Sequence, residues 1–271
     1  MLQPSFILFV LVCLFICYVF LGGAYVFFIQ KWSRPQPYYY KDSTFIFGHR
    51  GSPTKITENT IASFEKAIQQ GVDGLELDVR LTKDKQIIIF HDADLQRLLG
   101  ENNKIKDLTY NQTQKYSFKE NTKIPLLEEV LPLLEKVKAV NIEIKSERIC
   151  SGHGIISPLV NFLNKNNIDH KCVVSSFNPL ILWRIKRKRP QTTIGCLYVC
   201  NKFFASWNNL VWMMRVKPDS LHIHYSLLDS WVVRWARKKG MHINSYTIND
   251  KKTFDGAKID GAFTDNIEYL K

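Results

Sequence analysis

The feature that most constrains the fold is a regular alternation of strand-like and helical segments over residues 44–270. The strand-like runs are rich in β-branched and aromatic residues, whereas the segments between them repeat apolar residues at helical spacing. Besides one hairpin arm, we expect strands at eight places: 44–47, 75–81, 139–144, 171–175, 193–199, 220–224, 242–246 and 261–263. Eight strands separated mostly by helices predict a (β/α)8 TIM barrel, in which the chemistry lies at the C-terminal strand ends.

The second of these strands carries two carboxylates, Glu76 and Asp78, among Leu75, Leu77 and Val79. Successive side chains of a strand point to opposite faces, so both carboxylates lie on one face and the apolar side chains on the other. Two neighbouring negative charges need a compensating positive charge, and a divalent cation that takes oxygen ligands is a common solution. The context favours a metal site, although a solvated strand edge is the usual alternative for a Glu-x-Asp pair alone.

A short polar turn at residues 82–85 follows this strand and leads into a second apolar run at residues 86–90. A parallel crossover needs about a dozen residues, which is more than this turn provides. We therefore expect the second run to fold back antiparallel, so that His91 returns toward the carboxylate pair. Residues 93–123 are polar and weakly periodic, and we expect an excursion with short helical pieces there.

The N-terminal residues form an uncharged apolar segment. Residues 1–30 contain no Asp, Glu, Lys or Arg, and the stretch from Phe6 to Ile29 exceeds the roughly 20 residues that cross a hydrocarbon core. A cleaved signal peptide is the alternative, but a basic amino-terminal region is missing and the stretch is long for one. Lys31, Arg34 and Lys41 follow the span, so the positive-inside rule predicts a cytoplasmic catalytic domain. We expect three parts: a transmembrane anchor at 1–30, a linker at 31–43 and the catalytic domain at 44–271.

The composition adds weaker indications. The chain has 37 Lys and Arg against 25 Asp and Glu, and its densest basic clusters lie at residues 184–189 and 234–239. We interpret these clusters as solvated helix faces, with attraction to an anionic membrane as the next alternative, and we expect no nucleic acid partner. The cysteines lack metal-ligand or disulfide spacing, so we expect reduced thiols, buried at Cys172 and Cys196.

Eight short motifs follow one another along the catalytic domain: His49-Arg50-Gly51, Glu58-Asn59-Thr60, Glu76-Leu77-Asp78, Thr82-Lys83-Asp84, His91-Asp92, Glu143-Ile144-Lys145, Ser176-Phe177 and Gly261-Ala262-Phe263-Thr264-Asp265. This ordered set resembles the glycerophosphodiester phosphodiesterases, over about residues 44–270. None of the motifs is specific by itself, but the ordered set is. The resemblance implies a TIM barrel with a small insertion, a divalent cation, Mg²⁺ or Ca²⁺, and a hydrolase that converts glycerophosphodiesters to glycerol 3-phosphate and an alcohol.

The resemblance also implies roles for individual residues: Glu76, Asp78 and Glu143 as metal ligands, His49 and His91 as catalytic histidines, and Arg50 and Lys145 as phosphate-binding residues. Histidine has an ordinary pKa of about 6.5 and can act as a base or an acid near neutral pH. One histidine would deprotonate the nucleophile and the other would protonate the leaving alkoxide. Their assignment stays open at this point, as does the choice of water or the C2 hydroxyl of the substrate as nucleophile.

Several further residues have two readings. We expect Glu58, Asn59 and Ser176 to support the site, and Glu58 and Asn59 either cap the following helix or contact substrate. His222 and His224 lie two apart at a strand end, and structural roles are favoured over a place at the barrel mouth. The aromatic and Met-rich segment 201–214 predicts an apolar helix or loop, for which core packing and membrane contact stay open.

Three functions compete at this point. The first is a membrane-anchored, metal-dependent glycerophosphodiesterase that acts on a small-molecule substrate. The second keeps the chemistry but acts on lysophospholipids, as a lysophospholipase D that yields lysophosphatidic acid; the anchor and the basic clusters motivate it. The third is a non-enzymatic binding module for anionic lipid or nucleic acid, which the paired histidines beside a carboxylate cluster disfavour.

Overall fold

The computed structural model describes residues 4–32, 43–147, 152–199 and 203–270. The rest of the expected linker, including Arg34 and Lys41, lies outside the described residues, as do Cys150, Cys200 and the first two residues of segment 201–214.

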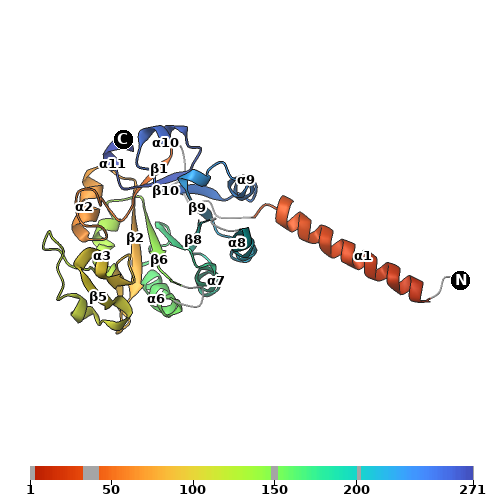
Figure 1. The fold of residues 1–271 in the computed structure, drawn as a ribbon, viewed down its shortest axis with the longest axis horizontal. Helices are drawn as coiled ribbons and strands as arrows, with labels where there is room; N and C mark the ends of the chain where they lie inside the picture. The colour runs from red at the N-terminus through yellow and green to blue at the C-terminus, as the bar shows by residue number, and fades with distance from the viewer. Residues whose placement is uncertain (1–3, 33–42, 148–151, 200–202, 271) are drawn as a thin grey trace.

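Eight parallel strands of the described chain form a closed barrel, with helices around it (Figure 1). These strands are β1 (Phe45–Gly48), β2 (Gly74–Leu81), β6 (Ala139–Ile144), β7 (Cys172–Ser176), β8 (Thr193–Tyr198), β9 (Ser220–His224), β10 (His242–Tyr246) and β11 (Gly261–Thr264). Strand β1 pairs in parallel with both β11 and β2, so the sheet has no free edge within the barrel. The predicted TIM barrel is confirmed.

Some of the helices between the strands begin at side-chain caps. Thr60 caps α2 (Ile61–Gln69) through a hydrogen bond from the Ser63 amide, and Asn178 caps α7 (Pro179–Lys188). The other barrel helices are α5 (Leu131–Leu134), which continues the 3₁₀ turn η3 (Leu127–Val130), α6 (Ile156–Asn166), α8 (Phe203–Val216), α9 (Trp231–Lys238), α10 (Lys251–Gly256) and α11 (Ile267–Leu270).

The expected hairpin is present. Strand β3 (Ile87–Ile89) pairs antiparallel with β2, and the Phe90 amide donates to the Asp78 carbonyl oxygen at 2.9 Å. The hairpin thereby places His91 beside the C-terminal half of β2. A small insertion follows, with its own apolar cluster, and consists of β4 (Asp94–Leu95), α3 (Gln96–Leu99), β5 (Glu101–Lys104), η2 (Ile105–Asp107) and α4 (Tyr110–Thr113).

The apolar core has two layers. The larger layer packs the outward faces of the strands against the helices, and it includes the thiol of Cys172. A smaller cluster of Phe45, Phe47, Ala139, Val173 and Phe263 fills the barrel interior. Cys172 and Cys196 are buried free thiols, as predicted, and burial raises the pKa of Cys196 to about 12. In α8, Leu210, Met213 and Val216 are buried whereas Val211 is exposed, so core packing explains one face of this helix.

The N-terminal helix α1 (Pro4–Ala24) projects away from the barrel and continues into the π-helical turn η1 (Tyr25–Ile29) (Figure 1). Residues 10–27 are long and apolar enough to cross a membrane by length and composition. The junction with the barrel is ordered. The buried Lys239 donates from Nζ to the carbonyl oxygens of Val26 and Gln30 at 2.6 and 2.8 Å, and Trp235 Nε1 donates to Phe27 O.

Candidate active site

Three acidic side chains converge at the C-terminal end of the barrel. Glu76 and Asp78 lie on β2 and Glu143 on the neighbouring β6, where Asp78 and Glu143 are register partners. All three are buried, and one carboxylate oxygen from each lies within 4.8 Å of the others. The structure thus brings together the three predicted metal ligands.

The charges of this cluster are only partly compensated. Burial and the negative charge of Asp78 raise the pKa of Glu76 to about 8, and burial also raises the pKa of Glu143. Burial acts in the same direction on Asp78, but the nearby charges of Lys145 and Arg50 outweigh it and lower the pKa of this carboxyl. The nearby cationic side chains therefore stabilise the ionised form of Asp78 but not that of Glu76 or Glu143.

The oxygen atoms of the cluster fit a hard cation. Glu76 Oε2 accepts a hydrogen bond from the Arg50 amide at 2.8 Å, but Glu76 Oε1 is buried without a hydrogen-bond partner. Asp78 Oδ2 accepts from Asn59 Nδ2 at 2.8 Å, whereas Oδ1 is buried and makes no hydrogen bond, 3.4 Å from Lys145 Nζ. Buried carboxylate oxygens that lack partners are costly, and a divalent cation with oxygen ligands would satisfy them.

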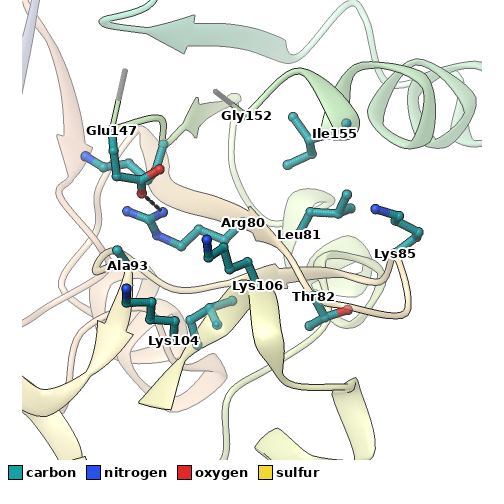
Figure 2. Close-up of a pocket in the computed structure, with 13 residues that line it drawn as sticks. Arg80, Leu81, Thr82, Lys85, Ala93, Lys104, Lys106, Glu147, Gly152 and Ile155 are labelled. Atoms are coloured by element: carbon teal, nitrogen blue, oxygen red, sulfur yellow. Dashed lines mark hydrogen bonds and ion pairs between the residues drawn. The ribbon is translucent and has the colours of Figure 1, made fainter. Parts of the chain in front are cut away.

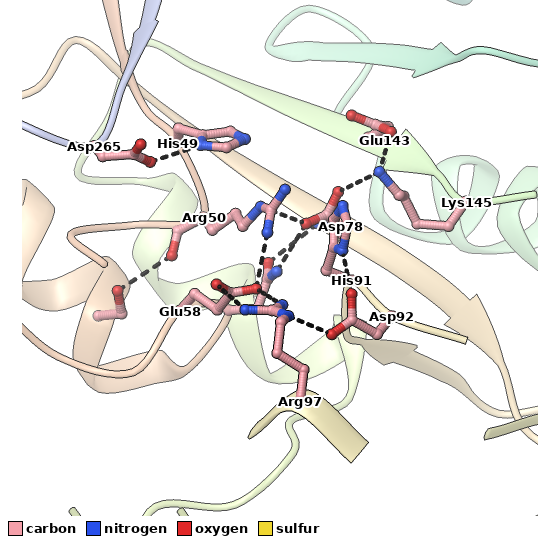
Figure 3. Close-up of polar contacts among 12 residues, drawn as sticks. His49, Arg50, Glu58, Asp78, His91, Asp92, Arg97, Glu143, Lys145 and Asp265 are labelled. Atoms are coloured by element: carbon pink, nitrogen blue, oxygen red, sulfur yellow. Dashed lines mark hydrogen bonds and ion pairs between the residues drawn. The ribbon is translucent and has the colours of Figure 1, made fainter. Parts of the chain in front are cut away.

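The loop after β1 positions Arg50 and His49. Gly51 has a φ of +90°, and a Cβ atom there would lie 2.7 Å from the backbone carbon of Ser63, so the tight turn requires glycine. Arg50 itself has a φ of 56° and directs its guanidinium toward two carboxylates. Its Nη1 lies 2.9 Å from Glu58 Oε1 and its Nε lies 3.2 Å from Asp78 Oδ2 (Figure 3).

His49 is paired with a carboxylate from the other end of the chain. Its Nδ1 lies 2.7 Å from Asp265 Oδ1 (Figure 3). Asp265 is held in turn by the Asn249 side chain through two hydrogen bonds. Burial acts to lower the pKa of His49, but the hydrogen bond to Asp265 and the charge of Glu76 raise it above the ordinary value. Asp265 belongs to a sequence motif, but only the fold shows that it contacts His49.

His91 has a different environment. Its Nδ1 lies 2.6 Å from Asp92 Oδ1, while Asp92 Oδ2 accepts from Arg97 Nε at 2.6 Å, and Arg97 also binds Glu58 (Figure 3). Burial and the positive charges of Lys145 and Arg50 lower the pKa of His91. Arg97 lies on α3 of the insertion and was missed by sequence reasoning, because no motif or periodicity marks it.

The remaining predicted residues divide between the site and its surroundings. Lys145 Nζ lies 2.5 Å from Glu143 Oε1, so this ammonium group adjoins the carboxylate cluster. Asn59 orients Asp78 and Glu58 binds two arginines, whereas Thr60 is the cap of α2. Ser176 is not brought to the cluster: its hydroxyl donates to Ile144 O and accepts from the Asn178 amide.

Several of the residues described above line one cavity of about 230 Å³. His49 and His91, the two predicted catalytic histidines, line it together with Arg50, Glu76, Glu143 and Lys145. Phe177, Leu197, Tyr246 and Phe263 form an apolar wall. His222 lines it as well, and burial lowers the pKa of this histidine to about 3, so the ring is neutral. His222 Nε2 contacts Ser220 and Asn244, whereas His224 contacts Ser226 and lies outside the cavity lining.

Known proteins resemble this chain over most of its length. Residues 49–269 match the model of the glycerophosphoryl diester phosphodiesterase family. The chain is 34% identical to the glycerophosphodiester phosphodiesterase of Caldanaerobacter subterraneus subsp. tengcongensis over 238 residues, which cover 84% of this chain and 96% of that protein.

Solved structures give the same result. The glycerophosphodiester phosphodiesterase of Thermotoga maritima superposes with a TM-score of 0.69 at 33% identity, over 84% of this chain and 97% of that one. An Oleispira antarctica phosphodiesterase, solved in complex with the product sn-glycerol-3-phosphate, superposes with a TM-score of 0.75 at 25% identity, over 87% and 98%. The lysophospholipase D GDPD1 of Mus musculus is 38% identical over a shorter range of 110 residues, 36% of this chain and 35% of that protein.

Proposed function

This chain belongs to the glycerophosphoryl diester phosphodiesterase family, and from this premise we propose that it hydrolyses glycerophosphodiesters to glycerol 3-phosphate and an alcohol in the cavity between His49 and His91. The proposal rests mainly on the buried cluster of three carboxylates, two of which, Glu76 and Glu143, line one cavity with His49, His91 and two cationic side chains. A protein that only binds ligands has no need of this combination.

Glu76, Asp78 and Glu143 would hold one divalent cation, and their all-oxygen donor set suits Mg²⁺ or Ca²⁺. When bound, this ion supplies charge that polarises a phosphoryl oxygen. Arg50 and Lys145 bind the remaining phosphate oxygens. The guanidinium can contact two oxygens as a planar fork, whereas the ammonium acts as a point charge.

The surroundings of the two histidines favour one assignment of acid and base. In the described ranges Asp265 forms no salt bridge with a lysine or arginine, so its full charge supports a protonated His49. The charge of Asp92 is shared with Arg97, so His91 receives less support for its protonated form. We assign His91 as the base that deprotonates the nucleophile and His49 as the acid that protonates the leaving alkoxide.

The proposal is tested by the release of glycerol 3-phosphate from glycerophosphoglycerol. His49→Ala should lower kcat/KM by about 100-fold or more, the usual loss when a general acid is removed. Chelation of divalent ions should abolish turnover, and added metal should restore it. His170→Ala, at an exposed histidine, is the matched control and should keep normal activity. Normal turnover by chelated protein, or by the His49 variant, contradicts the proposal.

We further propose that residues 1–30 anchor the catalytic domain, residues 44–271, to the cytoplasmic face of a membrane through the linker at 31–43. The length and composition of residues 10–27 support this tether. Full-length protein should stay with the membrane after carbonate extraction, whereas a chain that begins near Lys41 should be soluble. Release of the full-length chain by carbonate contradicts the anchor.

A lysophospholipase D activity is the second candidate, because the N-terminal helix and the similarity to lysophospholipase D GDPD1 of Mus musculus both favour a lipid substrate. Rates on matched substrates with and without one acyl chain decide between the two. Rejection of the acylated substrate excludes this activity.

A further inference from the structure

A second cavity, of about 640 Å³, lies next to the catalytic cavity and is lined by cationic side chains. One of its lining residues, Glu147, is acidic, and five are basic: Arg80, Lys85, Lys104, Lys106 and Lys145. Figure 2 shows Glu147 paired with Arg80, and Lys85 on the opposite side of the view. These residues come from three separate parts of the fold, namely the β2–β3 hairpin, the insertion and the segment after β6. The cavity is therefore a product of how the insertion packs against the barrel.

Lys145 lines both cavities, so the two border the same side chain. Ala93, two residues after His91, lines the second cavity, and Arg80 Nε donates to the carbonyl oxygen of His91 at 2.9 Å. A substrate whose phosphodiester contacts Lys145 therefore lies at the border of the second cavity.

The positive charge of the second cavity is largely uncompensated. Glu147 is the single carboxylate in its described lining, and it forms an ion pair with Arg80. Lys85, Lys104 and Lys106 are exposed and form no salt bridge within the described ranges of the chain. Like charges gathered around one cavity raise the local concentration of anions and repel cations.

We propose that this cavity is a subsite for a second anionic group, a phosphate or carboxylate carried by the alcohol portion of the substrate. The inference rests on the proposed hydrolysis of glycerophosphodiesters and specifies which members of that class are preferred. Lys85, Lys104 and Lys106 bind the distal anion, while Lys145 contacts the phosphodiester that is cleaved. Substrates with a cationic alcohol, such as choline, are disfavoured because the same lysines repel them.

Three glycerophosphodiesters test the proposal: glycerophosphocholine, glycerophosphoglycerol, and glycerophosphoglycerol with a terminal phosphate. At low ionic strength, kcat/KM should be highest for the phosphorylated substrate and lowest for the choline ester. The value for the phosphorylated substrate should be about tenfold above that for glycerophosphoglycerol, whose alcohol portion is uncharged. High salt should compress these differences, because exposed charges are screened. The expected pattern appears in kcat/KM ratios and so does not depend on the amount of active enzyme.

The informative variant is K85N/K104Q/K106Q. Lys85 has a φ of 65°, and asparagine tolerates this left-handed conformation, so the turn is kept while the charge is removed. The variant should lose the preference for the phosphorylated substrate while its kcat/KM on glycerophosphoglycerol changes by less than about twofold. The control K136Q/K251Q/K252Q removes three exposed lysines outside the cavity lining and should keep the wild-type preference.

Equal rates on the three substrates, or an equal loss on all of them in the cavity variant, overturn the subsite. Inorganic phosphate tests whether the cavity binds a free anion from solution rather than an anionic group of the substrate. If it changes the rate on glycerophosphoglycerol through the cavity lysines while the wild type shows no preference for the phosphorylated substrate, the cavity takes free anions and the proposal is wrong. A wild-type protein that fails to cleave any of the three substrates instead contradicts the proposed function.

Discussion

The protein buries charged groups both at the barrel mouth and at the junction with the N-terminal helix, and it compensates these two sets differently. At the mouth, the cluster of Glu76, Asp78 and Glu143 retains buried oxygens without hydrogen-bond partners. At the junction, the ammonium group of Lys239 is buried, and it donates to two backbone carbonyl oxygens. Its Nζ also lies 5.7 and 5.8 Å from the ring centres of Trp32 and Trp235.

The difference distinguishes a site built for a ligand from a site built for the fold. Lys239 is satisfied by fixed dipoles and aromatic rings, so the junction is complete as it stands. The carboxylate cluster stays electrostatically incomplete until positive charge is added, which is expected where stability is given up for chemistry. The following predictions test this contrast, beginning with the largest effect.

The largest contrast concerns activity. Glu76→Gln should lower kcat/KM about 1,000-fold, because it removes a ligand for the ion that stabilises charge in the transition state. Lys239→Met should leave kcat/KM on a soluble substrate within about twofold, because the junction does not line the catalytic cavity. Steady-state kinetics of both variants measure the contrast. A large loss of activity in the Lys239 variant would contradict the predicted contrast.

The second prediction concerns stability without metal. The pKa of Glu76 is raised from 4.5 to about 8, so the folded state binds a proton that the unfolded chain has released. Chelated wild-type protein should therefore lose stability as the pH rises from 4.5 toward 8, by up to about 5 kcal/mol. Glu76→Gln should flatten this dependence, and added metal should oppose the loss in the wild type. Urea unfolding at several pH values measures it; a flat wild-type profile contradicts it.

The third prediction concerns the junction. Lys239→Met leaves the carbonyl oxygens of Val26 and Gln30 without their donor, and we expect a loss of about 1–2 kcal/mol in the stability of the junction. The loss should appear as faster amide exchange around Trp32, measured by hydrogen exchange on full-length protein. Lys238→Met, at the exposed neighbouring position, is the control. Equal exchange in both variants would mean that the lysine is dispensable there.

The smallest effect concerns the two histidines. A protonated His49, with a raised pKa, and a neutral His91, with a lowered one, predict a bell-shaped pH profile of kcat/KM with one limb on each side of pH 6.5. Asp265→Asn should move the upper limb to lower pH by about one unit, because the charge that supports the protonated ring is removed. A shift of the lower limb instead would exchange the two assignments.

Sequence reasoning was most successful where the deciding contacts are local. Side-chain alternation placed Glu76 and Asp78 on one face, and the length of the turn at residues 82–85 established that β3 is antiparallel. The ordered motifs identified the family and the barrel that the comparisons confirm. Ser176 was expected near the site because it ends a strand, but its hydroxyl is used by the backbone, a choice that strand position does not reveal.

The sequence by itself determined the barrel, the carboxylate pair, the returning histidine and the apolar N-terminal segment, because each follows from short-range stereochemistry and spacing. The tertiary structure alone decided that Asp78 adjoins Glu143, that Arg97 joins Glu58 to Asp92, and that Lys239 reaches Val26. It also decided that three distant segments surround a basic cavity. These contacts join residues far apart in the chain, so their formation depends on strand register and on the packing of the insertion, which local patterns do not encode.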